Sequence, residues 1–188
     1  MRQLLIGAVL FLAACTGKPS LDDPALGDRD LNLEEFFQGE TVARGQFQDI
    51  FGTVRRRFDV TIDGDWDGRT LTLTEDFLYS DGETEQRIWR ITRTGEGTYE
   101  GRADDVVGVA NGVARGKALN WSYDLMLKVG DSRIKVSFND WMFLQPDGVL
   151  INKADVSKFG ITIGTVTLFF QKGARPESAS SGRRKTAA

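Results

Sequence analysis

Polar and apolar residues alternate with period two through most of the chain, from about residue 40 to residue 171. This period is typical of β-strands that bury one face. Short turn sequences, many of them Asp-Gly, interrupt the alternation at regular intervals, and Asp-Gly is a strong hairpin signal. The expected strands cover residues 41–49, 53–63, 69–79, 84–94, 97–105, 108–115, 117–129, 132–145, 149–157 and 161–171.

Consecutive strands joined by short turns predict an antiparallel meander. A meander this long is expected to close on itself, because closure removes the exposed edge strands. We therefore expect an all-β fold closed into a barrel of about 8–10 strands, whose interior is filled by side chains or holds one small ligand. A sandwich of two sheets is the alternative fold.

The alternation also assigns side chains to the barrel interior. In the strand 117–129, one face carries only apolar and aromatic residues: Leu119, Trp121, Tyr123, Leu125, Leu127 and Val129. We expect this face to be buried. If the barrel holds a ligand, the aromatic residues expected to line the apolar part of its cavity are Trp89, Trp121, Tyr123 and Trp141.

Four charged residues interrupt faces that are otherwise apolar: Arg56, Glu75, Arg87 and Asp140. An unpaired buried charge is costly, so each should have a partner. The hairpin of strands 53–63 and 69–79 is expected to bring Arg56 near Glu75. One interpretation is an ion-pair network, or charges that reach solvent at the barrel mouth. The other is a ligand site in which Arg56 or Arg87 binds a carboxylate or phosphate.

Gly and Ala occupy alternate positions in residues 101–103 and 108–116, so one face of these strands is nearly bare. Such a face permits a sharp bend of the barrel wall, a β-bulge, or the close approach of a ligand or another backbone. A coiled corner of the barrel is the interpretation we favour from the sequence.

The N-terminus has the pattern of a bacterial lipoprotein signal. Arg2 precedes the apolar stretch 4–12, and two alanines lead to Cys15, the single cysteine of the chain. The stretch is shorter than the ~20 residues of a membrane-spanning helix. We expect cleavage after residue 14 and lipidation of Cys15, which would anchor the protein in the cell envelope, facing the periplasm. Thr16 after the cysteine favours the outer membrane over the inner.

The expected organisation is a signal peptide (1–14), a lipidated tether (15–33), one barrel domain (34–172) and a disordered tail (173–188). A short helix is expected within residues 32–37. The chain has 24 basic and 27 acidic residues, and these are interleaved, which argues against nucleic-acid binding.

The chain contains no histidine. This excludes Ser-His-Asp and Cys-His catalytic sites and histidine-based metal sites. We expect no cofactor and no metal, and any catalysis would depend on residues such as Glu75 and Asp140.

Several stretches in order resemble the DUF3833 family of bacterial lipoproteins. They are Phe36-Phe37-Gln38-Gly39, Gly45-Gln46-Phe47-Gln48-Asp49, Arg56-Arg57-Phe58, Asp81-Gly82-Glu83 with Arg87 and Trp89, Asp104-Asp105-Val106-Val107-Gly108, Asp140-Trp141-Met142, Asn152-Lys153-Ala154, Ser157-Lys158-Phe159-Gly160 and Val166-Thr167-Leu168-Phe169-Phe170. Lys117 stands where the resemblance leads us to expect Asn. The resemblance implies a lipid-anchored, lipocalin-like barrel of Gram-negative bacteria, with no established activity and a hint of lipid handling.

Three functions remain open at this point. The first is binding of a hydrophobic or amphipathic small molecule, with a fatty acid or other lipid as the leading candidate. The second is a lipid-modifying enzyme that uses Glu75 and Asp140 as acid and base. The third is a structural or interaction protein of the envelope, docking through the bare Gly/Ala strands or an exposed turn at Trp66.

Overall fold

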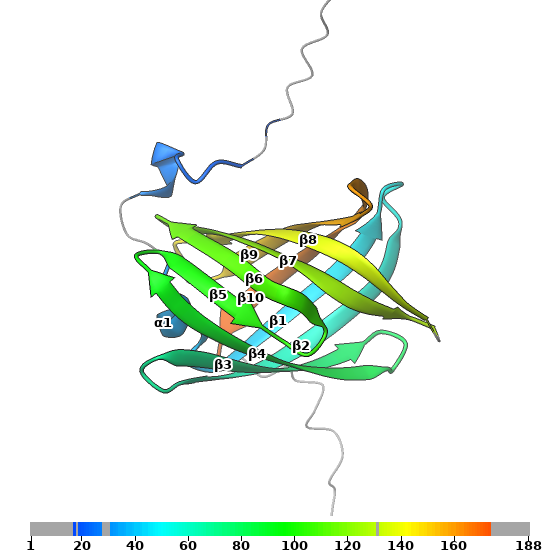
Figure 1. The fold of residues 1–188 in the computed structure, drawn as a ribbon, viewed down its shortest axis with the longest axis horizontal. Coiled ribbons are helices and arrows are strands. Elements are labelled where there is room, and N and C mark those ends of the chain that lie inside the picture. The colour runs from blue at the N-terminus through cyan, green and yellow to red at the C-terminus, as the bar shows by residue number, and fades with distance from the viewer. Residues whose placement is uncertain (1–16, 18, 28–30, 131, 174–188) are drawn as a thin grey trace, which may run out of the picture.

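The computed structural model describes residue 17 and residues 19–27, 31–130 and 132–173. In it, ten antiparallel strands follow one another around a closed barrel (Figure 1). The elements are η1 (Pro24–Leu26), α1 (Leu33–Phe37), β1 (Gly39–Asp49), β2 (Val54–Trp66), β3 (Thr70–Tyr79), β4 (Thr84–Gly95), β5 (Thr98–Arg102), β6 (Val106–Arg115), β7 (Ala118–Val129), β8 (Ser132–Leu144), β9 (Leu150–Lys158) and β10 (Ile161–Lys172).

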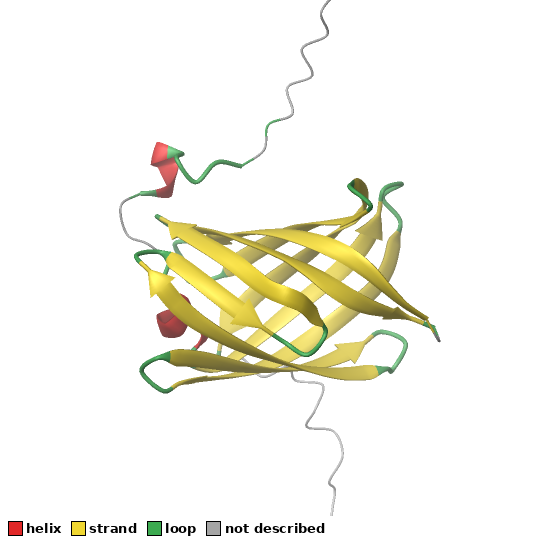
Figure 2. Ribbon diagram, in the orientation of Figure 1, coloured by secondary structure: helices red, strands yellow, loops and turns green. Residues whose placement is uncertain are grey.

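The barrel closes through the pairing of the first and last strands. β1 pairs antiparallel with β10, from Thr41 opposite Lys172 to Asp49 opposite Gly164. Every other pair joins strands that are neighbours in the sequence. The sandwich alternative is therefore excluded, and the predicted all-β meander is confirmed (Figure 2).

The expected strand ranges agree with the observed ones to within three residues at every end. The agreement arises because the turn residues used for the prediction do end the strands. Gly52 and Gly82, for example, have φ of 81° and 85°, a left-handed conformation that glycine adopts without steric cost.

The two ends of the barrel differ. The turns after β2, β4, β6 and β8 lie at the end covered by α1, which we call the closed end. The turns after β1, β3, β5, β7 and β9 lie at the opposite end, which we call the open end, and Figure 2 shows no described helix there.

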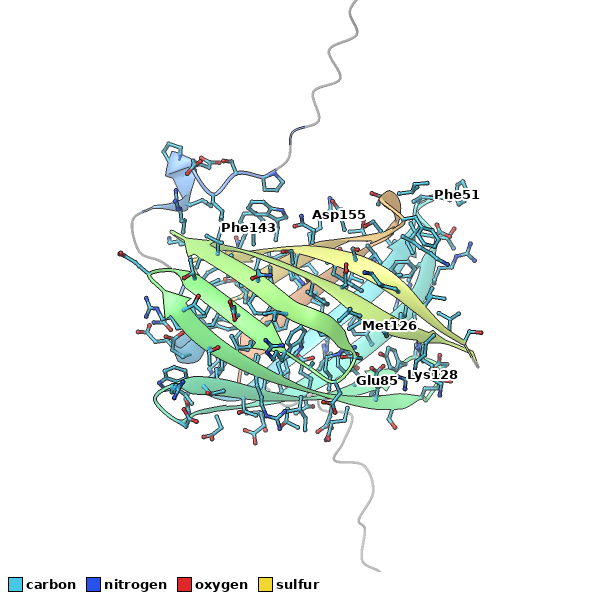
Figure 3. The ribbon with its side chains drawn as sticks, in the orientation of Figure 1. Phe51, Glu85, Met126, Lys128, Phe143 and Asp155 are labelled. Carbon is cyan, nitrogen blue, oxygen red and sulfur yellow. The ribbon has the colours of Figure 1, made fainter. Side chains whose placement is uncertain are left out.

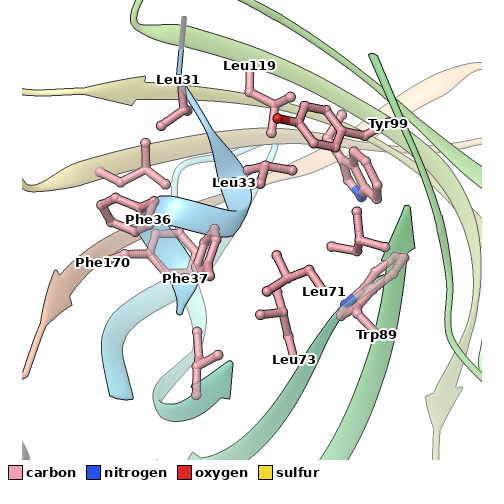
Figure 4. Packing of buried hydrophobic residues seen from close by; sticks show 14 of the residues in the cluster. Leu31, Leu33, Phe36, Phe37, Leu71, Leu73, Trp89, Tyr99, Leu119 and Phe170 are labelled. Atoms are coloured by element: carbon pink, nitrogen blue, oxygen red, sulfur yellow. The ribbon is translucent and has the colours of Figure 1, made fainter. Parts of the chain in front are cut away.

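Helix α1 plugs the closed end. Asn32 caps it, because its side-chain oxygen accepts a hydrogen bond from the Glu35 N–H at 3.1 Å. Leu33, Phe36 and Phe37 are buried, and Figure 4 shows them packed with residues from the barrel wall. The helix lies so close to β2 that a Cβ at Gly64 would collide with the Phe37 carbonyl.

The segment before the plug also lies on the closed end. Leu31 is buried and donates its N–H to the Gly116 carbonyl at 2.6 Å. The Lys117 N–H donates to the Leu26 carbonyl at 2.9 Å, and Arg115 pairs with Asp22 at 2.6 Å. Cys15 and the tail from residue 174 lie outside the described residues. Within the described part, no helix has the length and apolar character needed to cross a membrane.

Candidate ligand-binding site

The barrel interior has a sealed half and an accessible half. Near the closed end, the inward-facing residues are almost fully buried, including Ile62 (1% exposed), Leu71 (2%) and Leu119 (1%). Toward the open end, Leu125, Val136 and Val156 form a second small buried cluster (2%, 1% and 2% exposed), and most of the inward-facing residues around it are only partly buried. We call these partly buried residues the mouth wall: Phe47, Phe58, Phe77, Tyr79, Leu127, Ile134, Phe138 and Val166. These residues are the part of the interior wall that solvent reaches.

Aromatic rings form two groups in the mouth half. In the first, Phe58, Phe77 and Tyr79 contact one another with ring centroids 5.8–6.0 Å apart. In the second, Trp89 contacts Tyr123 edge to face at 5.3 Å, and Tyr123 stacks on Phe138 at 5.1 Å. Such rings offer a large apolar surface to a ligand.

The bare Gly/Ala face makes room for a tryptophan. A Cβ at Gly101 would lie 2.6 Å from the Trp121 ring, and a Cβ at Gly112 would also collide with it. The favoured interpretation, a coiled corner, therefore misses the main role of these glycines, which is close approach of an indole. The register of β6 and β7 also shifts between Val107 and Asn111, so the ladder is irregular there.

Arg87 is the centre of an inward-facing ion cluster. It is bound to Asp105 at 2.9 Å and to Glu85 at 3.2 Å, and Glu75 lies 3.9 Å away. Its burial opposes the positive charge, but Glu75 and Asp105 together raise its pKa above the usual value. Burial raises the pKa of Glu75 to about 7, against the opposing effect of Arg87. Because the Arg87 guanidinium is already ion-paired with these carboxylates, it is poorly placed to bind an anionic ligand.

Asp140 is the most buried of these charged groups, with 4% of its surface exposed. The Asn152 side chain donates a hydrogen bond to its Oδ1 at 2.6 Å. Its Oδ2 and the Asn152 Oδ1 are buried without hydrogen-bond partners. Burial raises the pKa of Asp140 to about 7. A ligand group that both donates and accepts hydrogen bonds, such as a hydroxyl, suits these two unpartnered atoms.

Arg56 lies at the rim of the open end. Its Nη2 pairs with Asp81 at 3.0 Å and with Glu83, and its guanidinium lies 3.5 Å from the centre of the Tyr79 ring. The predicted pairing of Arg56 with Glu75 is wrong, because the register of β2 and β3 places Glu75 opposite Ile62, six residues away. Glu75 lies beside Arg87 instead.

With this geometry described, comparison with known proteins adds the family. The family described as a protein of unknown function (DUF3833) matches residues 9–172. The chain belongs to the DUF3833 family. A comparison with curated proteins found no match.

Among solved structures, this DUF3833 protein is similar to the S-type phycobiliprotein lyase CPES from Guillardia theta. The TM-score is 0.52 at 9% identity, and the match covers 77% of this chain and 95% of the lyase. At this identity the similarity shows the fold alone, which is lipocalin-like, as expected.

The structure of the DUF3833 protein brings most of the predicted site residues together. Glu75, Arg87, Asp140, Trp89, Trp121 and Tyr123 all face the interior, and Arg56 lies at its rim. Trp141 does not belong to this set. It directly follows the inward-facing Asp140 in β8, so its side chain lies on the outer face of the barrel, where it stacks against Phe143. Its inclusion among the lining residues broke the period-two rule.

One other prediction, the exposed docking turn at Trp66, needs adjustment. Trp66 is half-buried against the core and donates its backbone N–H to the Gln38 side chain at 3.0 Å, so its turn is not a free docking face. At the sequence level, Asp105 and Asn152 are named only within the family motifs, and neither is predicted as a site residue. Asp105 lies in a turn, where alternation assigns no face. Asn152 lies on the same strand face as the buried Leu150 and Ala154, and this period-two pattern could have identified it as inward-facing.

Proposed function

We propose that this protein binds a hydrophobic or amphipathic small molecule, a fatty acid or another lipid, in the open half of its barrel. The observation that carries the proposal is the contrast between the sealed closed end and the partly exposed aromatic mouth wall. Soluble proteins rarely leave large apolar surfaces accessible without a use. The lipocalin-like fold, shared with a phycobiliprotein lyase, supports a small-molecule ligand.

The ligand would replace contacts that the rings of the mouth wall now make with one another. Two surface hollows, of about 460 and 600 Å³, lie outside the barrel interior, at β3–β4 and at the segment around Asp22. Because the rings of the mouth wall are in contact with one another, we infer that they shift when the acyl chain enters. An anionic head group would bind at the rim, where the partners of Arg56 are themselves 52% and 73% exposed and are displaced at little cost.

The proposal includes an anchor at Cys15, in the envelope of a Gram-negative cell and facing the periplasm, with the outer membrane favoured. It rests on the sequence pattern around the cysteine. Mass spectrometry of the protein purified from its native membrane tests it. We expect the mature chain to begin at Cys15 and to carry acyl chains on it. An unmodified Cys15, or an uncleaved chain that still begins at Met1, would contradict the proposal.

Ligand binding is tested by native mass spectrometry after incubation of delipidated protein with a bacterial lipid extract. We expect a retained lipid mass in the wild type and its loss in Phe138→Asp, which places a charge in the mouth wall. The matched control is Asn139→Asp, on the outer face of the same strand. A lipid bound equally by both variants, or none bound by the wild type, would contradict the proposal.

A second candidate function is a carboxylate-dependent enzyme acting on a lipid. It is favoured by the buried, unpartnered Oδ2 of Asp140, in a part of the barrel that also holds Glu75. Its test is Asp140→Asn and Glu75→Gln in protein incubated with the bound lipid. A chemical change of the lipid in the wild type, lost in either variant, would support it, and an unchanged lipid in all three would reject it.

A further inference from the structure

Large apolar side chains project into solvent from two adjacent hairpin turns at the open end. In the hairpin of β9 and β10, the turn residue Phe159 is 93% exposed and Ile161, the first residue of β10, is 70% exposed; in the turn after β1, Phe51 is 84% and Ile50 61% exposed. These hairpins are neighbours because β1 pairs with β10. Figure 3 shows Phe51 at the end of the barrel opposite α1. We call these four residues the apolar tips.

The Phe159 side chain adds little to the packing of the fold. Phe159 is the single non-glycine residue with positive φ among the described residues, at 53°, and Gly160 follows at 78°. Two consecutive positive φ values define a turn that favours Asn-Gly. A bulky residue in this conformation is strained, and here the side chain also makes almost no buried contact. Strain retained at an exposed position indicates a role outside the fold.

The charges around the mouth are unevenly distributed. Counting each turn and the two strand residues on either side of it, the hairpins β1–β2, β7–β8 and β9–β10 carry four basic residues and one acidic residue among the described residues, which are Arg55, Lys128, Arg133, Lys158 and Asp49. In the same window, the hairpins β3–β4 and β5–β6 carry five acidic residues and one basic residue, which are Asp81, Glu83, Glu85, Asp104, Asp105 and Arg102. The basic side is also the side with the apolar tips, and Lys158 lies 5.4 Å from the centre of the Phe159 ring. Apolar and aromatic residues bordered by Lys and Arg are typical of surfaces that bind anionic bilayers.

We propose that the apolar tips insert into the surface of an anionic phospholipid bilayer and dock the open end of the barrel against it. The shape favours a bilayer over a protein partner, because single side chains on narrow turns penetrate a lipid interface but offer no continuous face for a protein. The docking gives a lipid ligand a path from the bilayer to the mouth wall, and in this respect it rests on the proposed function.

The test is flotation of the protein with vesicles of phosphatidylcholine, with and without phosphatidylglycerol. A chain starting at Gly17 removes any contribution of an anchor at Cys15 and keeps every contact described above. We expect the wild type to float with the vesicles that contain phosphatidylglycerol, and salt to weaken this binding. Phe159→Asn and Phe51→Ser should each weaken it about tenfold, since each removes one inserted ring.

Phe159→Asn separates docking from folding. Because Asn-Gly suits the turn, the variant should melt at a higher temperature than the wild type while binding vesicles less. The matched control is Phe169→Asn, at a phenylalanine that is 49% exposed on the outer wall of β10, away from the tips. This control should bind vesicles as the wild type does.

The proposal would be overturned if the wild type did not float, or if Phe159→Asn floated as well as the wild type. It would also be overturned if the wild type bound no vesicles but formed a dimer that Phe159→Asn converts to a monomer. The last would make the tips a contact between copies of the chain. Lipid retention, measured in solution as above, distinguishes failure of docking from failure of ligand binding. A protein that retains lipid but does not float keeps the proposed function, and one that floats without retaining lipid keeps only the docking.

Discussion

The closed and open ends of this barrel are built from the same ten strands but have different physical properties. At the closed end, α1 and the inward-facing wall exclude water, and Leu33 and Phe37 are 3% and 4% exposed. At the open end, Phe58 and Phe138 remain accessible, and Phe159 is almost entirely in solvent. The most tightly packed part of the core and the accessible apolar surface therefore lie toward opposite ends of the barrel axis. The closed end holds the fold, while the open end keeps apolar surface available.

The largest expected effect comes from removing an aromatic ring at each end. Phe37→Ala at the closed end should lower the free energy of unfolding by about 3–5 kcal/mol, since it leaves a cavity in a fully packed core. Phe58→Ala at the open end should cost only about 1–2 kcal/mol, because its ring is already partly hydrated. Urea denaturation of both variants measures this. Equal losses would show that the two ends do not differ as described.

A smaller effect is expected from pH. The folded chain keeps protons on Glu75 and Asp140 up to about pH 7, whereas the unfolded chain releases them near pH 4. The free energy of unfolding should therefore fall as the pH rises from about 5 to about 8, by roughly 2 kcal/mol for each carboxyl.

Asp140→Asn isolates the share of one carboxyl. It should be more stable than the wild type at about pH 8; this advantage should be roughly 2 kcal/mol smaller at about pH 5, where the folded wild type is protonated, and should vanish only below about pH 4, where the unfolded wild type is protonated too. Thermal melts across this range measure it. A variant that is less stable than the wild type at the higher pH would show that the charged form of Asp140 is favoured in the fold.

The smallest effect on stability is expected from Arg56→Gln at the rim. Its partners Asp81 and Glu83 are exposed, so the loss should be about 1 kcal/mol or less. Affinity for a fatty acid should nevertheless fall about tenfold, as for the loss of a charge-assisted hydrogen bond. Affinity for the methyl ester of the same acid should not change. An equal decrease for acid and ester would contradict a head-group role for Arg56.

Alternation along the strands was enough to predict the barrel and the inward direction of Glu75, Arg87 and Asp140. It could not predict the ion partners, because these depend on register. The pairing of Ile62 with Glu75 separates Arg56 from Glu75, and the turn residue Asp105 reaches Arg87 from a segment that has no alternation. Nor could it predict that Gly101 and Gly112 make room for Trp121, because this contact joins three strands.

The most direct test of the central claim is to locate a bound fatty acid by photocrosslinking. A fatty acid with a diazirine near its methyl end would be added to the delipidated protein, irradiated, and mapped by peptide mass spectrometry. We expect adducts on inward-facing residues of the open half, around Phe58 and Phe138. Adducts confined to the outer hollows or to the plug around Phe37, or none at saturating probe, would contradict the claim that the open half of the barrel binds the ligand.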